Sequence, residues 1–324
     1  MKVEQLRINE ARLMARLDEL AAIGATADGS CCRLALTDED KAGRDLVVGW
    51  MKALGLEVRV DPIGNIFGLR RGTEDVDPVM TGSHIDTVRT GGRYDGNLGV
   101  LGALEVMQVL NEAGIATRRP LAVGVFTDEE GARFQPDMLG SLVYAGGLPL
   151  AQAYETVGID GKMLKDELAR IGYLGEAPLP LARPHAFVEL HIEQGPVLLE
   201  RGLPVGVVTS IAGNVRKRVT VSGLASHAGT TPMAMRRDAL AAASEMVLAV
   251  ERRCGDPRYA AQALVGTVGM AAVPQGAANV VPGRCEFSLD VRAAADAIRD
   301  EAVADLDAEF ARIAHRRGVE LSLS

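Results

Sequence analysis

The chain has 324 residues, of which 48% are hydrophobic, and this length predicts about two domains with well-filled cores. A disordered tail and a small scaffold held by disulfides are therefore excluded. Lys and Arg number 35 against 43 for Asp and Glu, a formal charge of −8, so nucleic acid and anionic membranes are not expected partners. Four poorly spaced cysteines and the lack of a long uncharged apolar run predict a protein of the reducing cytoplasm, without a targeting or membrane segment.

The first two thirds of the chain alternate expected helices with expected strands. In chain order these are helices at 3–22 and 38–54, a hairpin of strands at 57–60 and 65–70, a strand at 79–82, a helix at 98–110, and strands at 121–127 and 186–191. This alternation is typical of an α/β fold with a mostly parallel sheet, in which ligands bind beyond the carboxyl ends of the strands.

The spacing of apolar residues changes after Gly213. The expected elements are then a strand at 215–222, a helix at 236–253, strands at 264–272 and 284–292, a helix at 294–317 and a strand at 319–323. Their order, β-α-β-β-α-β, is that of the ferredoxin-like split unit. The sequence therefore predicts two domains, 1–213 and 214–324.

A glycine-rich segment after the strand at 79–82 carries the first candidate site residues. In an extended stretch His84 and Asp86 would point the same way, so Asp86 could accept the second imidazole N–H of a metal-binding His84. Asp95 lies on a glycine-flanked loop that is able to fold back. Taken alone, such a segment is more often a polar surface turn.

Two further strands also end in residues that can bind metals. Glu129 and Glu130 follow a buried strand, and because adjacent side chains diverge, one could bind a metal while the other acts as general base on a water molecule. His191 ends the next strand beside two acids. A solvated acidic turn and a packed histidine are the alternatives for each segment alone. Three strand ends that meet at one sheet edge nevertheless predict a metal site.

The second domain offers polar side chains that could meet a substrate. His227 lies in a turn of small residues just past a strand, Asn279 adds an amide, and Arg292 could grip a substrate carboxylate through a bidentate pair. A solvent-facing histidine and a surface salt bridge are the alternatives for His227 and Arg292. His185 lies in a loop and His315 at the Arg-rich end of a helix, and neither is given a role.

Together these segments resemble one known family. Their sequences are GSHIDTVRTGGRYDGNLGV at 82–100, FTDEEGARF at 126–134, ELHIEQGP at 189–196, GLASHAGTTPM at 223–233, and NVVPG and LDVR at 279–283 and 289–292. They are similar to the amidase branch of the M20 metallopeptidase-like family, which comprises N-carbamoyl-L-amino-acid hydrolases, β-ureidopropionases and allantoate amidohydrolases. The resemblance runs from about residue 12 to residue 324.

The resemblance implies a role for each candidate residue. A catalytic α/β domain would hold two divalent ions (zinc, manganese, cobalt or nickel), and an inserted lid, the 214–324 domain, would also form a homodimer. The implied metal ligands are His84, Asp95, Glu130 and His191, with Asp95 bridging the ions. The other implied roles are support of the ligands for Asp86, general base for Glu129, and substrate binding for Gln194, His227, Asn279 and Arg292.

By the same resemblance we expect hydrolysis of the ureido C–N bond of N-carbamoyl-L-amino acids, giving the amino acid, carbon dioxide and ammonia. Glu129 would take the proton of the attacking water, His227 would stabilise the oxyanion, and Arg292 would select a small substrate with a carboxylate. Allantoate and β-ureidopropionate remain alternative substrates, although segments 33–38 and 92–95 look closer to those of carbamoylases.

The family pattern continues after the lid with a return to the catalytic domain, which carries a histidine for the second metal. This sequence has no matching segment before Ser324. We therefore expect the catalytic domain to lack its return segment, and the second metal site, left with Asp95 and Glu130, to be weaker than the first. The alternative is a catalytically incompetent fragment that dimerises and binds ligands.

Overall fold

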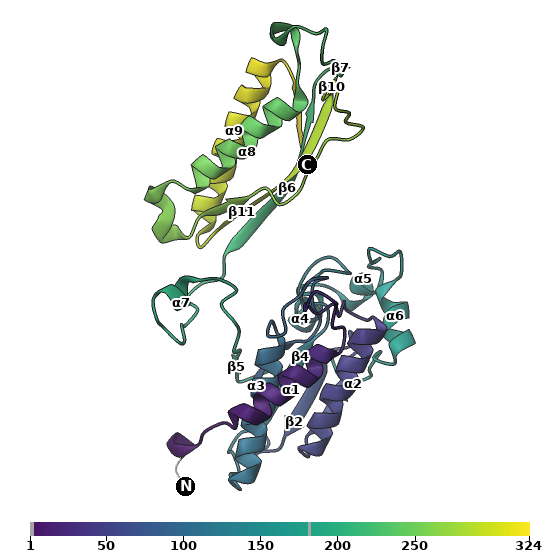
Figure 1. Cartoon of the computed structure of the whole chain (residues 1–324). Helices are drawn as coiled ribbons and strands as arrows, with labels where there is room; N and C mark the ends of the chain where they lie inside the picture. Colours follow the sequence, from purple (N-terminus) through teal and green to yellow (C-terminus); the bar gives the residue numbers. More distant parts are fainter. Residues whose placement is uncertain (1–2, 181–182) are drawn as a thin grey trace. The chain divides into compact units, whose positions relative to one another are not determined.

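The computed structural model describes residues 3–180 and 183–324, and the chain forms two compact units, Met1–Leu203 and Pro204–Ser324 (Figure 1). The sequence pattern places the domain boundary between 213 and 214, where regular strand spacing begins. Each unit has its own hydrophobic core. In the described part of the chain, no helix combines the length and the apolar character needed to cross a membrane.

The first unit is built on a five-stranded sheet with the order β1-β2-β4-β3-β5. Its strands are β1 (Glu57–Val60), β2 (Ile66–Arg70), β3 (Val79–His84), β4 (Leu121–Phe126) and β5 (Ala186–Val188). β2 pairs antiparallel with β1 and β4, whereas β3 pairs parallel with β4 and β5. The sheet is therefore mixed, and its parallel part holds the three strands whose carboxyl ends carry candidate residues.

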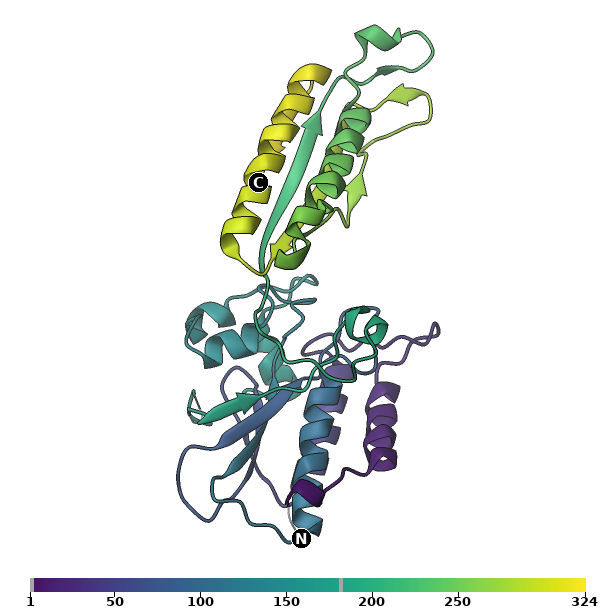
Figure 2. The same ribbon diagram turned by 90° about the vertical axis from the view of Figure 1, so that its left-hand side faces the viewer.

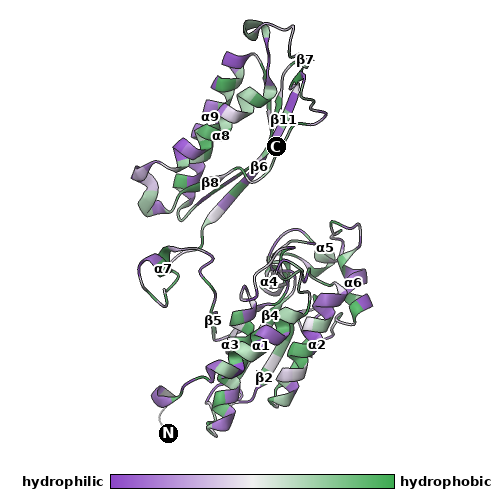
Figure 3. Cartoon of the chain, viewed as in Figure 1, coloured by the Kyte–Doolittle hydropathy of each residue, from purple (hydrophilic) through white to green (hydrophobic). Residues whose placement is uncertain are grey.

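The first unit has three long helices, namely α1 (Glu10–Ala22), α2 (Asp38–Ala53) and α3 (Asn97–Glu112), and α1 packs against α3. α2 begins where the spacing predicts, because the Thr37 side chain accepts a hydrogen bond from the Asp40 N–H at 3.3 Å. α1 begins later than predicted, because Asn9 caps it by accepting from the Arg12 N–H at 3.1 Å. α3 contacts β3 and β4, and α2 contacts β1 and β2. Both α1 and α2 carry hydrophobic and hydrophilic residues (Figure 3), as expected of helices with one buried face.

The segment after β4 forms three short helices that hydrophobic spacing does not indicate, α4 (Leu139–Tyr144), α5 (Leu150–Tyr154) and α6 (Leu164–Ile171). They have five to eight residues, too few for a helical period to stand out. α4 brings Tyr144 against Phe67 of β2, with ring centroids 5.4 Å apart, beside the small cluster of Phe67, Met80 and Ala122. Shorter pieces of this unit are η1 (Val3–Gln5) and α7 (Val197–Glu200).

The second unit is an antiparallel sheet packed against two helices. The sheet has the order β12-β6-β11-β8, with β9 also paired to β11. Its strands are β6 (Gly213–Ser222), β8 (Val265–Thr267), β9 (Ala271–Ala272), β11 (Arg284–Ala293) and β12 (Glu320–Leu323). α8 (Ala239–Cys254) and α9 (Asp296–Arg317) lie on the same face of this sheet (Figure 2). The predicted ferredoxin-like order of elements is therefore present.

One predicted strand of this unit is interrupted. The span 264–272 splits into β8 and β9, and between them the Met270 N–H donates to the Ser288 hydroxyl at 3.1 Å instead of to a backbone carbonyl. The connections form a separate two-stranded sheet of β7 (Ser226–His227) and β10 (Val280–Val281). Two short 3-10 turns, η2 (Met233–Met235) and η3 (Pro257–Gln262), complete the unit.

Candidate metal centre

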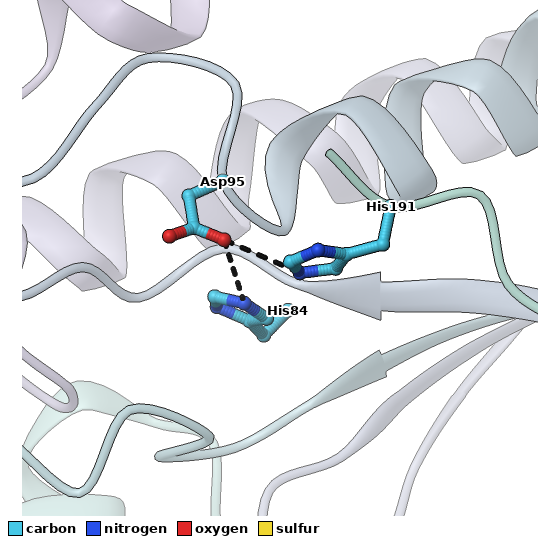
Figure 4. A group of neighbouring side chains, drawn as sticks. All are labelled: His84, Asp95 and His191. Carbon is cyan, nitrogen blue, oxygen red and sulfur yellow. Dashed lines mark ion pairs between the residues drawn. The ribbon is translucent and has the colours of Figure 1, made fainter. Parts of the chain in front are cut away.

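Three segments of the first unit converge where its parallel strands end. His84 is the last residue of β3, Asp95 lies on the loop before α3, and His191 lies three residues beyond β5. Their side chains point toward one another (Figure 4). β5 ends at Val188, earlier than predicted, yet the chain beyond it still carries His191 to this edge of the sheet.

The three side chains direct their ligand atoms at one point. His191 Nε2 lies 3.2 Å from Asp95 Oδ1, and His84 Nε2 lies 4.0 Å from the same oxygen. All three ligand atoms lie within 4.8 Å of one another. The imidazole rings are stacked, with centroids 6.2 Å apart and planes inclined by 29°. This spacing leaves room for one ion with metal–ligand bonds of about 2 Å.

The hydrogen bonds of the two histidines decide which ring nitrogen is free. Nδ1 of His84 lies 3.0 Å from the Asp86 carbonyl oxygen, and Nδ1 of His191 lies 2.9 Å from the Ile192 carbonyl oxygen. Because a carbonyl oxygen only accepts, each Nδ1 carries a hydrogen and each Nε2 of the neutral ring presents a lone pair. Asp95 Oδ1 is buried and has no hydrogen-bond partner among the described residues. The lone pairs of the two Nε2 atoms and of Asp95 Oδ1 repel one another unless a cation lies between them. These three atoms therefore fit as ligands of a divalent metal ion.

The surroundings of His84 favour positive charge at this point. Burial lowers the pKa of the imidazole, but the charges of Asp86, Glu129 and Glu130 outweigh burial and raise this pKa above its usual value. The same negative field that would keep a proton on the ring attracts a metal cation.

The Asp86 carboxylate has hydrogen-bond partners other than the predicted His84 ring. The carboxylate lies 3.8 Å from His84 Nδ1, beyond hydrogen-bond distance, and the Asp86 backbone carbonyl accepts that N–H instead. The buried carboxylate accepts hydrogen bonds from the backbone N–H groups of Glu129 and Glu130, each at 3.2 Å. Two backbone donors attract the carboxylate more strongly than one ring N–H that is already bonded. Asp86 thus anchors the segment that carries both glutamates.

Burial raises the pKa of both glutamates. Glu129 Oε2 lies 3.3 Å from His84 Nε2, and burial raises the pKa of Glu129 although the nearby His84 lowers it. Burial also raises the pKa of Glu130, to about 7, with Asp95 adding to the effect and His84 opposing it. A carboxyl group that titrates near neutral pH can accept a proton and return it, as a general base must. Glu130 lies outside the group formed by His84, Asp95 and His191.

Gln194 lies against the aspartate of this group. Its side-chain amide donates a hydrogen bond from Nε2 to Asp95 Oδ2 at 2.5 Å. The two oxygens of Asp95 therefore have different neighbours, since Oδ1 faces the histidines. The structure thus brings a predicted substrate-binding residue into direct contact with a predicted metal ligand.

His227 lies in the small sheet of the second unit, and Asn279 directly precedes its other strand, β10. His227 Nδ1 accepts a hydrogen bond from the Gly229 N–H at 3.0 Å, so Nε2 of the neutral ring carries the hydrogen and is a donor. The Asn279 carbonyl accepts a hydrogen bond from the Ala228 N–H at 2.9 Å, which holds it beside the turn of His227. This tautomer is opposite to that of His84 and suits a ring that donates to an oxygen.

Arg292 forms a bidentate pair inside its own strand. Nε and Nη2 donate to the two carboxylate oxygens of Asp290 at 2.8 and 3.0 Å. The salt bridge that the sequence offers as the alternative is therefore present, and it orients the guanidinium. Of the histidines without a predicted role, His185 bonds through its backbone N–H to Pro78, and His315 is exposed on α9.

Buried polar residues that the sequence patterns do not mark hold the start of the glutamate segment. Asn65 Oδ1 accepts from the Thr127 N–H at 2.9 Å, and Arg44 donates to the Thr127 hydroxyl at 3.2 Å. Arg44 also donates to the Asp40 carboxylate at 2.7 Å. The four-residue spacing of Asp40 and Arg44 on α2 is a visible signal of a helical ion pair. Their burial is not visible, because it depends on how α2 packs.

An α/β fold with such donors beyond its strand ends, and a glutamate beside them, is typical of metal-dependent hydrolases. The profile of peptidase family M20/M25/M40 matches residues 80–319, and the chain belongs to this family. The family resemblance of the sequence motifs, and the fold class that it implies, are thereby confirmed.

Relatives that match nearly the whole chain include proteins named as amidohydrolases, hydrolases and amidases. The chain is 42% identical over 323 residues to an N-carbamoyl-L-amino acid amidohydrolase of Geobacillus stearothermophilus, a match that covers 97% of this chain and 77% of that relative. It is 38% identical to a ureidoglycolate hydrolase of Arabidopsis thaliana, over 98% of this chain and 68% of that relative. A solved amidase of the hydantoinase/carbamoylase family from Burkholderia multivorans has a TM-score of 0.91 at 46% identity, covering 98% of this chain and 77% of that one.

Proposed function

We propose that the protein hydrolyses the ureido C–N bond of N-carbamoyl-L-amino acids, giving the amino acid, carbon dioxide and ammonia. The observation that carries this proposal is the convergence of His84 Nε2, His191 Nε2 and Asp95 Oδ1 on one point, with Glu129 beside it. The choice of substrate is supported by two relatives, 42% and 41% identical, that are named N-carbamoyl-L-amino acid amidohydrolases.

In this proposal His84, Asp95 and His191 hold one divalent ion, and Asp95 and Glu130 hold a second. Zinc, manganese, cobalt and nickel all accept imidazole and carboxylate ligands. A divalent ion bound here polarises the substrate carbonyl and lowers the pKa of a water molecule. Among the residues that the structure describes, three side chains are proposed for the first site and two for the second, so we expect these residues to hold the first ion more tightly.

Glu129 moves the proton in the proposed reaction. Its carboxylate takes a proton from the attacking water as the new C–O bond forms at the ureido carbon. It then gives that proton to the amino-acid nitrogen as the C–N bond breaks, and the carbamic acid left behind decays to carbon dioxide and ammonia. Burial raises the pKa of Glu129 above its usual value, which makes its carboxylate a better proton acceptor. The Asp86 carboxylate accepts a hydrogen bond from the Glu129 backbone N–H and so keeps Glu129 in place.

Four polar side chains recognise the substrate in this proposal. His227 donates from Nε2 to the oxyanion, an interaction typically worth about 3 to 4 kcal/mol. Arg292 binds the substrate carboxylate, and Gln194 and Asn279 contact the remaining polar groups. The second unit acts as a lid and forms a homodimer, so its residues come from the same protomer or from the partner. All four cysteines are free, which agrees with a cytoplasmic enzyme.

Allantoate and ureidoglycolate are the second candidate substrates. Relatives that are 38% and 37% identical to this chain are named ureidoglycolate hydrolase and allantoate deiminase. Both compounds, like β-ureidopropionate, carry a ureido group and a carboxylate, so the same centre and Arg292 suit each of them.

Ammonia release tests the proposal and ranks the substrates. The full chain is loaded with manganese, cobalt or zinc and incubated with N-carbamoyl-L-amino acids, allantoate, ureidoglycolate and β-ureidopropionate in parallel. We expect the highest kcat/KM with an N-carbamoyl-L-amino acid. A higher value with another compound would reassign the substrate, and no turnover of any of them would contradict the proposed hydrolysis.

Glu129→Gln should lower kcat about 10²- to 10⁴-fold, because the amide cannot accept the proton of the attacking water. The first metal should still bind, since Glu129 is outside the group of His84, Asp95 and His191. Steady-state kinetics and metal analysis of the same preparation measure both effects. Unchanged turnover in this variant would remove Glu129 from the mechanism.

A further inference from the structure

Arg33 is a fully buried arginine that the proposed chemistry does not use. Its guanidinium donates hydrogen bonds to carbonyl oxygens, to a side-chain amide oxygen and to the Cys31 sulfur, which are neutral partners. A buried cation of this kind is expensive to desolvate, so the positions of its partners are strongly constrained. Where these partners lie in the chain therefore shows what Arg33 holds in place.

One side of the guanidinium is bonded to the chain beside His84. Nε donates to the carbonyl oxygen of Ile85, which lies between His84 and Asp86, at 2.8 Å. The Arg33 backbone adds two bonds, since its N–H donates to the Thr87 hydroxyl at 2.8 Å and its carbonyl accepts from the Thr87 N–H at 2.9 Å. The chain that leaves β3 after His84 is thus held against Arg33.

The same guanidinium reaches the loop of Asp95. Nη2 donates to the Asn97 Oδ1 atom at 3.0 Å. Asn97 in turn donates from its backbone N–H to the Asp95 carbonyl at 2.6 Å and from Nδ2 to the Arg93 carbonyl at 3.2 Å. Arg33 therefore holds the residue that closes the turn of Asp95.

The rest of the guanidinium is anchored at the end of α1. Nη1 donates to the carbonyl oxygens of Leu20 and Ile23 at 3.0 and 2.8 Å. Carbonyls at a helix C-terminus carry partial negative charge, which offsets the charge of the arginine. Gly43 of α2 leaves space for the side chain, because a Cβ at this position would lie 2.9 Å from Arg33 Cδ.

We propose that Arg33 is a positioning residue of the metal centre that sets the separation of His84 and Asp95. These two ligands come from different segments, and the hydrogen bonds of Arg33 tie one segment to the other. Its planar fork presents N–H groups in several directions at once, whereas a lysine ammonium on a flexible stem cannot hold two segments at a fixed separation. The inference rests on the metal centre of the proposed function.

Metal affinity of the full chain tests this inference separately from activity. The metal-free protein is titrated with Co²⁺, whose visible absorption reports the geometry of its ligands, and with Zn²⁺ by calorimetry. Arg33→Lys should bind the first ion about 10- to 100-fold more weakly, as expected when a group that orients metal ligands is lost. The Co²⁺ spectrum should change as well, because the ligands no longer converge.

Arg133→Lys is the matched control. Arg133 is also a buried arginine, but its partners, Ala35, Asp160 and Glu167, lie outside both ligand segments. This variant should keep the wild-type metal affinity within about twofold, even where its free energy of unfolding falls, because it leaves the ligands in place.

Asn97→Ala keeps the inference testable if Arg33→Lys fails to fold. It removes the link between the guanidinium and the Asp95 loop, so it should weaken binding of the first ion to a similar degree. The double variant should bind the first ion no more weakly than the weaker-binding single variant, because either change alone already breaks the link between Arg33 and the Asp95 loop. Losses that multiply, or wild-type affinity in both single variants, would overturn the inference and leave the metal centre intact. A wild-type chain that binds no divalent ion would overturn both.

Discussion

Single hydrogen bonds decide which chemistry the candidate centre supports. Nδ1 of both His84 and His191 bonds to a backbone carbonyl, which leaves Nε2 of each ring facing Asp95. In His227 the arrangement is reversed, since Nδ1 is the acceptor. The sequence predicts these residue types, but the tautomers depend on backbone groups that only folding brings to each ring.

Gly96 allows the loop of Asp95 to approach His84. Its φ is +64°, and a Cβ on it would lie 2.4 Å from His84 Nε2. We expect Gly96→Ala to lower the affinity for the first ion about tenfold or more, because the added methyl group displaces the ligands. The free energy of unfolding should fall by about 1 to 2 kcal/mol, because alanine is strained at this φ. Calorimetric metal titration and denaturant unfolding measure the two effects.

Gly92→Ala is the control for this prediction. Gly92 lies in the same loop, and a Cβ on it would meet nothing within 4 Å. It should match the wild type in metal affinity. If Gly96→Ala also matched the wild type, the close approach of the loop to His84 would not govern the site.

Asp61 makes the stability of the first unit depend on pH. Burial raises the pKa of this carboxyl from 3.8 to about 6, although hydrogen bonds from Asn65 and Ile63 oppose the rise. Between pH 3.8 and about pH 6 the Asp61 carboxyl keeps a proton in the folded protein that it has lost in the unfolded chain. The contribution of Asp61 is therefore fully present below about pH 4 and is lost as the pH rises through about 6. The loss amounts to about 3 kcal/mol at most.

Asp61→Asn removes this dependence. The free energies of unfolding of wild type and variant are measured with denaturant at several pH values. As the pH rises from about 4 to about 6, their difference should shift so that the variant is favoured at pH 7. The control is Asp28→Asn, because hydrogen bonds from Thr26 and Ser30 lower the pKa of exposed Asp28 to about 2. The free energy of unfolding of Asp28→Asn should differ from that of the wild type by a constant amount above about pH 5. A constant difference for Asp61→Asn would contradict the assignment.

At the scale of elements, long regular spans follow the sequence pattern and short ones do not. α2, β3 and β4 lie close to their predicted positions, because buried faces impose a clear period on their residues. The sequence pattern does not indicate α4, α5 and α6, because these helices are too short for a period to appear. Between β8 and β9 the Met270 N–H bonds to a side chain of another strand, which no local pattern contains.

The start of α2 provides a test at this scale. Thr37 caps the helix through the Asp40 N–H, and its hydroxyl also donates to the Leu34 carbonyl at 2.9 Å. We expect Thr37→Ala to lower the free energy of unfolding by about 1 kcal/mol, because the cap is lost. Denaturant unfolding measures the change. Thr90→Ala, at an exposed loop position, should have little effect, and equal effects of the two variants would exclude a capping role.

At the scale of the whole molecule, the proposed metal centre combines side chains from three segments of the first unit. In the proposed function His84, Asp95 and His191 hold the first ion, and Asp95 and Glu130 hold the second. In a titration of the metal-free chain with Zn²⁺ we expect two separate steps, because the sites differ in ligand number. His191→Ala should lower the Zn²⁺ affinity of the first step, and Glu130→Gln should lower only that of the second step. Equal occupancy of both sites at low metal concentration would contradict this order.

The family, the order of the main elements and the residue types at the strand ends can be read from the amino-acid sequence alone. These follow from local periodicity and from motifs that lie within a few residues of one another, such as His84 with Asp86. Only the tertiary structure decided that Asp86 holds the Glu129 segment instead of the His84 ring. It also decided that Arg33 bonds to two ligand segments at once. Both contacts join residues far apart in the chain, and their partners are largely backbone atoms, which are the same at every position of a sequence and acquire individual roles only when the chain is folded.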